Sequence, residues 1–167
     1  MADKVIVMSD ALIQQTGTSR EIYETPRTKF VAEFIGNNNI FQGTIKSRSG
    51  SIVFVESETN LFYVRVPDHI RQVRIGGEAH FSVRADLMHT GERPDMANKV
   101  LGSYVTTEFM GSLETDVFEI EPGLFVHVEQ HRAANNRTYE MGDRAVVCWP
   151  ADAGVLLDQV TAESITN

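Results

Sequence analysis

The chain has 167 residues, 42% of them hydrophobic and 23% charged, and its formal net charge is −8 at pH 7. This length and composition support one domain, or one compact domain with a small appendage, and exclude wholesale disorder. The acidic balance argues against nucleic acid as a partner, and no apolar run approaches the roughly 20 residues of a membrane span, which argues against direct membrane insertion.

The first predicted elements are the two strands of a hairpin. Residues 4–8 are apolar and β-branched enough for a buried strand, residues 9–11 have turn chemistry, and residues 12–16 return as a second strand that Gly17 closes. A two-stranded hairpin alone is marginally stable in water. We therefore expect it to pack on a larger body, and the rest of this chain is the simplest candidate.

Two short helices are predicted next. Thr18 and Glu21 have the spacing of a capping box, and the helix that they start, over residues 19–24, ends before a proline. Thr28 caps a second helix over residues 29–35. Large apolar residues recur in it at i, i+1, i+4 and i+5, and we predict that they form a docking stripe that this chain covers only in part. The docking stripe consists of Phe30, Val31, Phe34 and Ile35.

The remainder of the chain is predicted to be a series of short strands. Gly36 and the asparagines at 37–39 form a polar joint, which divides the chain into domains 1–36 and 37–167. Turn residues separate the strands, as is typical of an all-β barrel or sandwich, and residues 86–98 are predicted to be a loop. The predicted strands are 40–48, 51–56, 61–66, 78–84, 100–109, 115–120, 124–129, 145–149 and 155–157.

A weak internal repeat links the two halves of this β region. The segment Asn39–Ile45 is echoed by Asn98–Val105, and Gly77-Glu78 is echoed by Gly142-Asp143, in the same order. This order indicates two related β units, with coincidence between two generic β patterns as the alternative. Two partial barrels could complete each other's sheets and cover each other's edges.

Several stretches share their order and residue types with one known family. In the N-terminal segment they are Ala2–Met8, Gln15–Thr18, Glu21–Tyr23, Pro26 and Phe30–Gly36, and in the β region they are Gly77–Asp86, Asn98–Gly102, Phe109–Ser112, Gly142–Asp152 and Val155–Leu157. The first group resembles the end of the ATPase domain of ABC importers, of the spermidine/putrescine type with the maltose and ferric-iron types nearby. The second group resembles the TOBE domain that follows. This sequence departs from the family pattern at Ala11 and Ser19, where glycine and proline are usual, and at Ala85-Asp86.

The resemblance implies a mainly β fold, in which an OB-like TOBE (MOP-like) β-barrel of two related units follows a small hairpin and two short helices. It implies the C-terminal regulatory and dimerisation portion of an ABC importer's ATP-binding subunit, of the polyamine type first and of the iron or sugar type next. The implied partners are a second copy, in a homodimer, and the membrane subunits, reached through an ATPase domain outside this sequence. The implied location is cytoplasmic and peripheral to the inner membrane, in keeping with a chain start that shows no signal peptide.

Four residues of the β region are candidates for interface or regulatory contacts. Arg84 and Asp86 could form an ion pair at an interface, with a surface charge as the alternative for Arg84. Trp149 could anchor a dimer contact, because tryptophan is enriched at interface hot spots, and core packing is the alternative. Asp152 is the fourth candidate, from its place in the second matching unit.

The sequence has no motif for ATP chemistry. The phosphate loop Gly-x4-Gly-Lys-Ser/Thr does not occur, and the family's Ser-Gly-Gly signature and switch histidine are absent. We therefore expect that this polypeptide is not an enzyme and holds no catalytic or cofactor-binding residue. ATP and magnesium would belong to the full-length subunit.

The remaining chemistry-bearing residues have simpler interpretations. His127, Glu129 and His131 share one face of a predicted strand, and a solvated strand face is favoured over a metal site, so no metal is predicted. Cys148, the only cysteine, excludes an intrachain disulfide and is expected to pack in an apolar strand.

The alternative function is a stand-alone TOBE-like protein that binds a small oxyanion, although no basic cluster marks an anion site.

Overall fold

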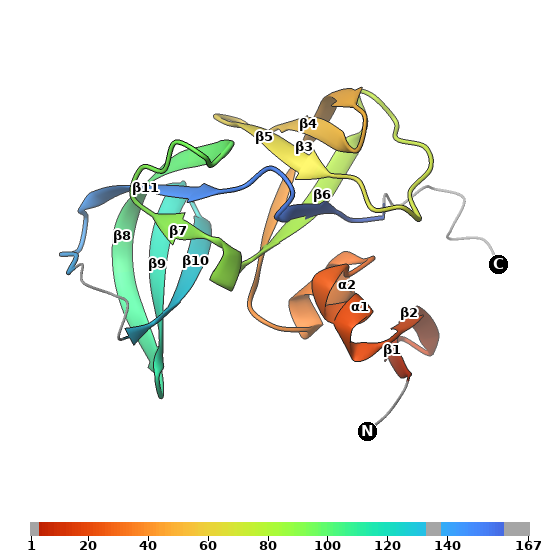
Figure 1. Cartoon of the computed structure of the whole chain (residues 1–167), viewed down its shortest axis with the longest axis horizontal. Coiled ribbons are helices and arrows are strands. Elements are labelled where there is room, and N and C mark those ends of the chain that lie inside the picture. Colours follow the sequence, from red (N-terminus) through yellow and green to blue (C-terminus); the bar gives the residue numbers. More distant parts are fainter. Residues whose placement is uncertain (1–3, 133–137, 159–167) are drawn as a thin grey trace.

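The structure, a computed structural model, describes residues 4–132 and 138–158. The parts of the two predicted domains at 1–3, 133–137 and 159–167 lie outside the described residues. Figure 1 shows a small N-terminal unit below a closed β-barrel, and an open sheet to the left of the barrel. This mainly β architecture confirms the predicted fold class.

The N-terminal unit contains the hairpin and the two helices that the sequence predicts. Its elements are β1 (Val5–Ser9), β2 (Leu12–Gly17), α1 (Ser19–Glu24) and α2 (Lys29–Phe34). The capping box is confirmed: the Glu21 N–H donates to the Thr18 hydroxyl at 3.1 Å, and the Thr18 N–H donates to the Glu21 carboxylate at 2.7 Å. The Thr18 N–H and the Thr18 hydroxyl both donate to the Glu21 carboxylate, and these two hydrogen bonds lower the pKa of Glu21. The second helix ends at Phe34, one residue earlier than predicted.

The turn between β1 and β2 places two residues other than glycine in the left-handed region. Asp10 has a φ of 51° and Ala11 a φ of 61°. Aspartate tolerates this conformation because its side chain can hydrogen-bond locally, whereas the Cβ of alanine is crowded by the following carbonyl. The usual glycine of this turn is therefore missing at the position that needs it.

Replacing Ala11 with glycine is expected to stabilise the hairpin. Glycine adopts a positive φ without the Cβ clash and loses more chain entropy on folding, so the net gain should be about 0.5–1 kcal/mol. Urea unfolding measures the change, and Asp10→Gly is the matched control with a smaller gain. Equal unfolding midpoints for Ala11→Gly and the unsubstituted protein would contradict the turn geometry.

The docking stripe of α2 divides between two environments. Val31 is fully buried and Ile35 is partly buried in a small cluster of apolar residues from β1, α1 and α2. Phe30 and Phe34 lie outside this cluster, with exposed fractions of 37% and 67%, and their rings stack at 5.9 Å. Residues i and i+1 of a helix are separated by about 100°, which explains why adjacent members of the stripe face different surroundings.

The closed barrel has five strands around an aromatic core. The strands, in order around the barrel, are β12 (Gly154–Leu156), β5 (Leu61–Arg65), β4 (Ile52–Glu56), β3 (Asn38–Ser49) and β6 (Glu78–Arg84). The rings of Phe41, Phe62 and Phe81 pack inside it with centroid distances of 4.9 to 5.3 Å. The barrel therefore has a filled aromatic core.

The second β unit is an open five-stranded sheet. Its strands, in order, are β10 (Leu124–His131), β9 (Leu113–Glu121), β8 (Asn98–Met110), β11 (Arg144–Trp149) and β7 (His89–Thr90). The stretch predicted as one loop at 86–98 contains β7 and most of a 3-10 helix, η1 (Ala85–Leu87). A strand of two residues has no detectable period, and this is why the sequence does not reveal it.

The two β units exchange their last strands. β7 follows the first unit in the chain but pairs with β11 of the second, and β12 follows the second unit but pairs with β5 and β6 of the first. Each unit therefore completes the sheet of the other, as the internal repeat predicted. The exchanged strands β7 and β12 cover strand edges that could otherwise pair with other chains and cause aggregation.

Equivalent hydrogen bonds and bulges confirm the repeat. Ile45 exchanges backbone hydrogen bonds with Gly76 and Gly77, and Tyr104 does the same with Gly142 and Asp143. The register of β3 against β4 shifts after Ile45, and that of β8 against β9 shifts after Tyr104. Each unit thus has a bulge at the same position of its repeat.

Candidate interaction surfaces and junctions

Two buried asparagines hold the β units together. The Asn39 side chain accepts from the His127 N–H at 2.7 Å and donates to the His127 carbonyl at 2.9 Å. In the other direction, Asn98 accepts from the Tyr63 N–H at 2.8 Å and donates to the Tyr63 carbonyl at 3.0 Å. Asn39 and Asn98 occupy equivalent positions of the repeat, so each unit clamps the backbone of a strand in the other unit.

These clamps were not predicted. The sequence predicted a polar joint at residues 37–39, whereas β3 begins at Asn38 and Asn39 is only 4% exposed. A run of asparagines ordinarily indicates a turn, because the amide competes for backbone hydrogen bonds locally. The equivalent Asn98 in the repeat was the one available signal that Asn39 has a structural partner.

Trp149 lies in the barrel core rather than on a surface. Its side chain is fully buried, and its ring stacks on Phe41 at 5.5 Å and on Phe62 at 5.7 Å. A fully buried indole offers no area to another molecule, so the alternative of core packing is correct and the dimer anchor is not. Trp149 belongs to β11, and the second unit thus contributes a central side chain to the core of the first.

Arg84 and Asp86 lie where the N-terminal unit meets the barrel. The guanidinium of Arg84 forms a two-pronged ion pair with Asp86, at 3.0 Å from Nε and 2.5 Å from Nη2, and lies 4.3 Å from the Tyr23 ring centroid. Burial opposes the charge of Arg84, but the hydrogen bonds and negative charge of Asp86 outweigh it and raise its pKa. The predicted ion pair exists, and it joins the end of β6 to η1 within this chain, while the Tyr23 ring brings α1 against the same guanidinium. A role at an interface between subunits stays a prediction.

Asp152 lies apart from that ion pair. Asp152 is exposed, and its backbone carbonyl oxygen accepts a hydrogen bond from Arg65 Nε at 3.3 Å. Asp152, Tyr23 and Arg84 all line one cleft of about 270 Å³. Three of the four candidate interface residues therefore surround or approach the junction, and the fourth is in the core.

A polar cleft of about 750 Å³ lies between α2 and the two β units. Glu121 of β9 is fixed at its edge by the β4–β5 connection: its Oε1 accepts from Thr59 at 2.6 Å, Ser57 at 2.9 Å and Asn60 at 3.1 Å. Burial acts to raise the pKa of Glu121, but these hydrogen bonds to the ionised form prevail and lower it. Glu121 thus ties the second unit to a turn of the first.

The lowered pKa of Glu121 predicts an acid-sensitive tie between the units. The ionised form is favoured by folding, so its stabilisation is complete above the usual value of 4.5 and is lost as the pH falls through the lower folded value. Glu121→Gln should lower stability at pH 7 and flatten the dependence of stability on pH below that value. Urea unfolding between pH 7 and pH 3 measures both effects, with the exposed Glu108→Gln as control. Parallel pH profiles for Glu121→Gln and the unsubstituted protein would contradict this role.

The N-terminal unit exposes six large apolar side chains, which together we call the N-terminal apolar face. Met8 and Ile13 form a cross-strand pair of the hairpin. Phe34 lies on α2 and is 67% exposed. The face consists of Ile6, Met8, Leu12, Ile13, Phe30 and Phe34, with exposed fractions from 37% to 67%. So many exposed apolar side chains on a unit of about 30 residues are typical of a surface that another protein covers.

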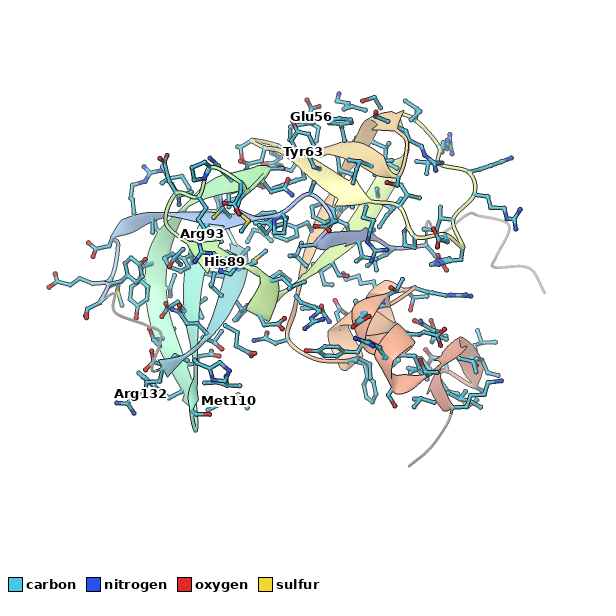
Figure 2. The ribbon with its side chains drawn as sticks, in the orientation of Figure 1. Glu56, Tyr63, His89, Arg93, Met110 and Arg132 are labelled. Atoms are coloured by element: carbon cyan, nitrogen blue, oxygen red, sulfur yellow. The ribbon has the colours of Figure 1, made fainter. Side chains whose placement is uncertain are left out.

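Metal and thiol chemistry have no support among the described residues. No group of three or more histidine, cysteine, aspartate or glutamate side chains in the described part could hold a metal ion. Burial raises the pKa of Cys148, and its thiol donates to the Gly91 carbonyl at 3.2 Å, so it is a packed thiol. Figure 2 shows His89 and Arg93 in the same region. Burial and, to a smaller extent, the positive charge of Arg93 lower the pKa of His89.

In the described ranges no helix has the length and apolarity to cross a bilayer.

A closed barrel and an open sheet that exchange their end strands define a TOBE/MOP-like β fold. The same fold occurs in a crystal structure of the cytoplasmic molybdate-binding protein ModG with molybdate bound, with a TM-score of 0.66 and 18% identity. That similarity covers 75% of this chain and 99% of the ModG chain. At this level of identity the similarity concerns the fold.

In sequence the chain is similar to the C-terminal part of the ATP-binding subunits of polyamine ABC importers, and the resemblance found in the sequence is confirmed. It is 32% identical over 152 residues to a spermidine/putrescine import ATP-binding protein of Marinobacter nauticus, and 29% identical over 149 residues to one of Roseobacter denitrificans. It is 27% identical over 161 residues to the putrescine transport ATP-binding protein PotG of Escherichia coli. These matches cover 88% to 94% of this chain and 40% to 42% of the relatives. No protein-family model matches the chain.

Proposed function

We propose that this chain is the C-terminal regulatory and dimerisation portion of the ATP-binding subunit of a polyamine-type ABC importer, with no catalytic role of its own. Residues 1–36 would then be the end of the ATPase domain, and residues 37–167 the TOBE-type regulatory domain. ATP and magnesium would bind to the ATPase domain, which would also contact the membrane subunits. The subunit would thus work in the cytoplasm, peripheral to the inner membrane.

The N-terminal apolar face is the observation that supports this proposal most directly. Its hairpin and helices have a small cluster of their own around Val31, yet Ile13 and Phe34 are more than 60% exposed. A partner that covers this face would remove apolar area from water, which is favourable by about 25 cal/mol per Å². The chain spans about 40% of the length of the curated relatives that it matches, and the ATPase domain would be that partner.

The experiment is a binding assay with the ATPase domain of a relative, such as the Marinobacter protein, produced without the segment that this chain matches. We expect the chain to bind it, and we expect Ile13→Glu and Phe34→Glu to weaken the binding at least about tenfold, as for residues at the centre of an interface. Phe109→Glu is the matched control, since Phe109 is 65% exposed and lies near the end of β8, in the second β unit. Biolayer interferometry measures the affinities.

The outcomes separate the parts of the proposal. Equal weakening by Phe109→Glu would show that the N-terminal apolar face is not the contact. An absence of binding by the unsubstituted chain would argue against residues 1–36 as the end of an ATPase domain. ATP hydrolysis by this chain alone, well above background, would contradict its non-catalytic role.

The second candidate is a stand-alone binder of a small oxyanion, which the fold shared with a molybdate-binding protein supports. Thermal unfolding in the presence of molybdate, spermidine or putrescine distinguishes the two candidates. A molybdate-dependent rise in the unfolding temperature, without binding to the ATPase domain, would favour the second candidate.

A further inference from the structure

The last strand of the open sheet, β10, has one edge that no other described strand covers. Its neighbour on one side is β9, and Figure 1 shows its other side toward the N-terminal unit. From that other side the Asn39 side chain bonds to both the N–H and the carbonyl of His127, so these two groups point away from β9. Because successive residues of a strand alternate in the direction of their backbone groups, Glu129 and His131 also point theirs away from β9.

The outward backbone groups of Glu129 and His131 have no partner within residues 4–132 and 138–158. The alternation is confirmed at the next residue, since the Arg132 N–H donates to the Ser112 carbonyl at 3.0 Å on the β9 side. Neither side chain takes part in a hydrogen bond or an ion pair with these described residues. A strand edge with free donors and acceptors is a template on which another strand can pair.

The internal repeat shows what the first unit has at the equivalent edge. Tyr63 corresponds to His127, because each is held by the equivalent asparagine. At the same spacing further along, Arg65 corresponds to Glu129. In the closed barrel Arg65 pairs with Val155 of β12, which also pairs with β6. The counterpart of β12 is β7, which pairs with β11 and with no second strand of the described chain. The position beside Glu129 is therefore open in the second unit, whereas a strand fills it in the first.

The side chains of this edge are complementary to a second copy of themselves. Val126 and Val128 are buried in the core, so the alternation of the strand places Glu129 and His131 on the outer face of the sheet. When two such edges pair antiparallel with Gln130 on the twofold axis, Glu129 lies directly opposite the partner's His131. A carboxylate accepts the imidazole N–H and pairs with its charge when the ring is protonated. The twofold arrangement is closed, so it leaves no edge from which a fibre could grow.

We propose that two copies of this chain associate by antiparallel pairing of their β10 edges at Glu129–His131. Glu129 exchanges both backbone hydrogen bonds with the partner's His131, and His131 does so with the partner's Glu129. Asn39 occupies the edge at His127 and ends the pairing there. The open sheets of the two copies then form one continuous sheet. This inference rests on the self-association in the proposed function and names the strand that makes the contact.

A proline substitution tests the backbone contact by sedimentation equilibrium of the full chain. Glu129→Pro removes an outward N–H that β9 does not use, so the pairing of β10 with β9 is kept. The twofold contact loses this hydrogen bond twice, and we expect the dimer dissociation constant to rise at least about tenfold. Phe109→Pro is the matched control, because the Phe109 N–H points away from β9 at the opposite edge of the same three strands. It should leave the constant unchanged.

Charge variants test the register of the two strands. His131→Glu places a carboxylate opposite each Glu129 of the pair, and we expect the dimer dissociation constant to rise at least about fivefold. The double variant Glu129→Lys/His131→Glu restores opposite charges and is expected to return the constant to within about threefold of its original value. Glu108→Lys changes an exposed charge on β8 and should have no effect on the constant.

Each outcome supports or overturns the contact. A dimer that tolerates Glu129→Pro, or that Phe109→Pro weakens equally, overturns it and leaves self-association standing. Failure of the double variant to recover also overturns it. A chain that stays monomeric at every concentration overturns the contact together with the proposed dimerisation, while binding to the ATPase domain remains a separate measurement. If Glu129→Pro weakens that binding in a monomeric chain, the edge pairs with a strand of a different protein. Far-UV circular dichroism shows whether each variant is folded, and the charge variants decide the question if the proline variant is not.

Discussion

Replacing Trp149 with alanine is expected to lower the free energy of unfolding by about 3–5 kcal/mol, as for other large-to-small substitutions in packed cores. The indole is fully buried and stacks on two phenylalanines of the barrel, so its removal leaves a cavity that rigid strands cannot fill. Because Trp149 comes from β11, the loss also weakens the attachment of the second unit to the first. Urea unfolding followed by far-UV circular dichroism measures the change, since the variant has no tryptophan to report fluorescence.

Trp149→Phe is the matched variant for this prediction. It keeps an aromatic ring and removes the indole Nε1–H, which is buried without a hydrogen-bond partner among the described residues. Removal of this unpaired polar group offsets part of the stability lost with the indole's packing. We therefore expect Trp149→Phe to lower the free energy of unfolding by much less than Trp149→Ala does. Equal costs for the two variants would contradict the stacking role of the ring. A cost below about 1 kcal/mol for alanine would contradict burial in the core.

The asparagine clamps are expected to give the second large effect. Asn39→Ala leaves the N–H and carbonyl of His127 without their partner, and two unpaired backbone groups should cost about 2–4 kcal/mol. Asn98→Ala removes the same two hydrogen bonds from Tyr63 and should cost a similar amount. Equilibrium unfolding in urea measures both variants, and Gln42→Ala, which removes an exposed side chain of the same β3 strand, should change stability by less than about 0.5 kcal/mol.

Amide hydrogen exchange at His127 and Tyr63 measures the effect of each asparagine clamp separately. Asn39→Ala should speed exchange of the His127 amide much more than that of the Tyr63 amide, and Asn98→Ala should do the opposite. General destabilisation would speed both amides together. Unchanged exchange at His127 in Asn39→Ala would show that the strand edge finds another partner.

Local signals explain which parts of the fold could be predicted. The capping box needs only Thr18 and Glu21, three residues apart, and both helices start where their caps predict. Strand alternation and turn residues predicted the strands of the two β units to within a few residues. The repeat predicted that two partial barrels complete each other, because equivalent residues recur in the same order.

Long-range relations explain the rest. The clamp from Asn39 to His127 joins residues 88 positions apart, and no local pattern separates it from a polar turn. The docking stripe was predicted as a single surface, but adjacent helical residues diverge, and only the surroundings show that Val31 turns inward while Phe34 stays exposed. For Trp149 the sequence left core and interface open, since the same apolar ring suits both environments.

The exchanged strands have a consequence for the order in which the chain acquires its structure during synthesis. The barrel of the first unit closes only when β12, near the end of the described chain, reaches β5 and β6. A nascent chain that has emerged as far as β6 therefore lacks a strand, and its partly formed barrel must wait for about 70 further residues. Both units are thus expected to mature together, after the ribosome has released most of the polypeptide.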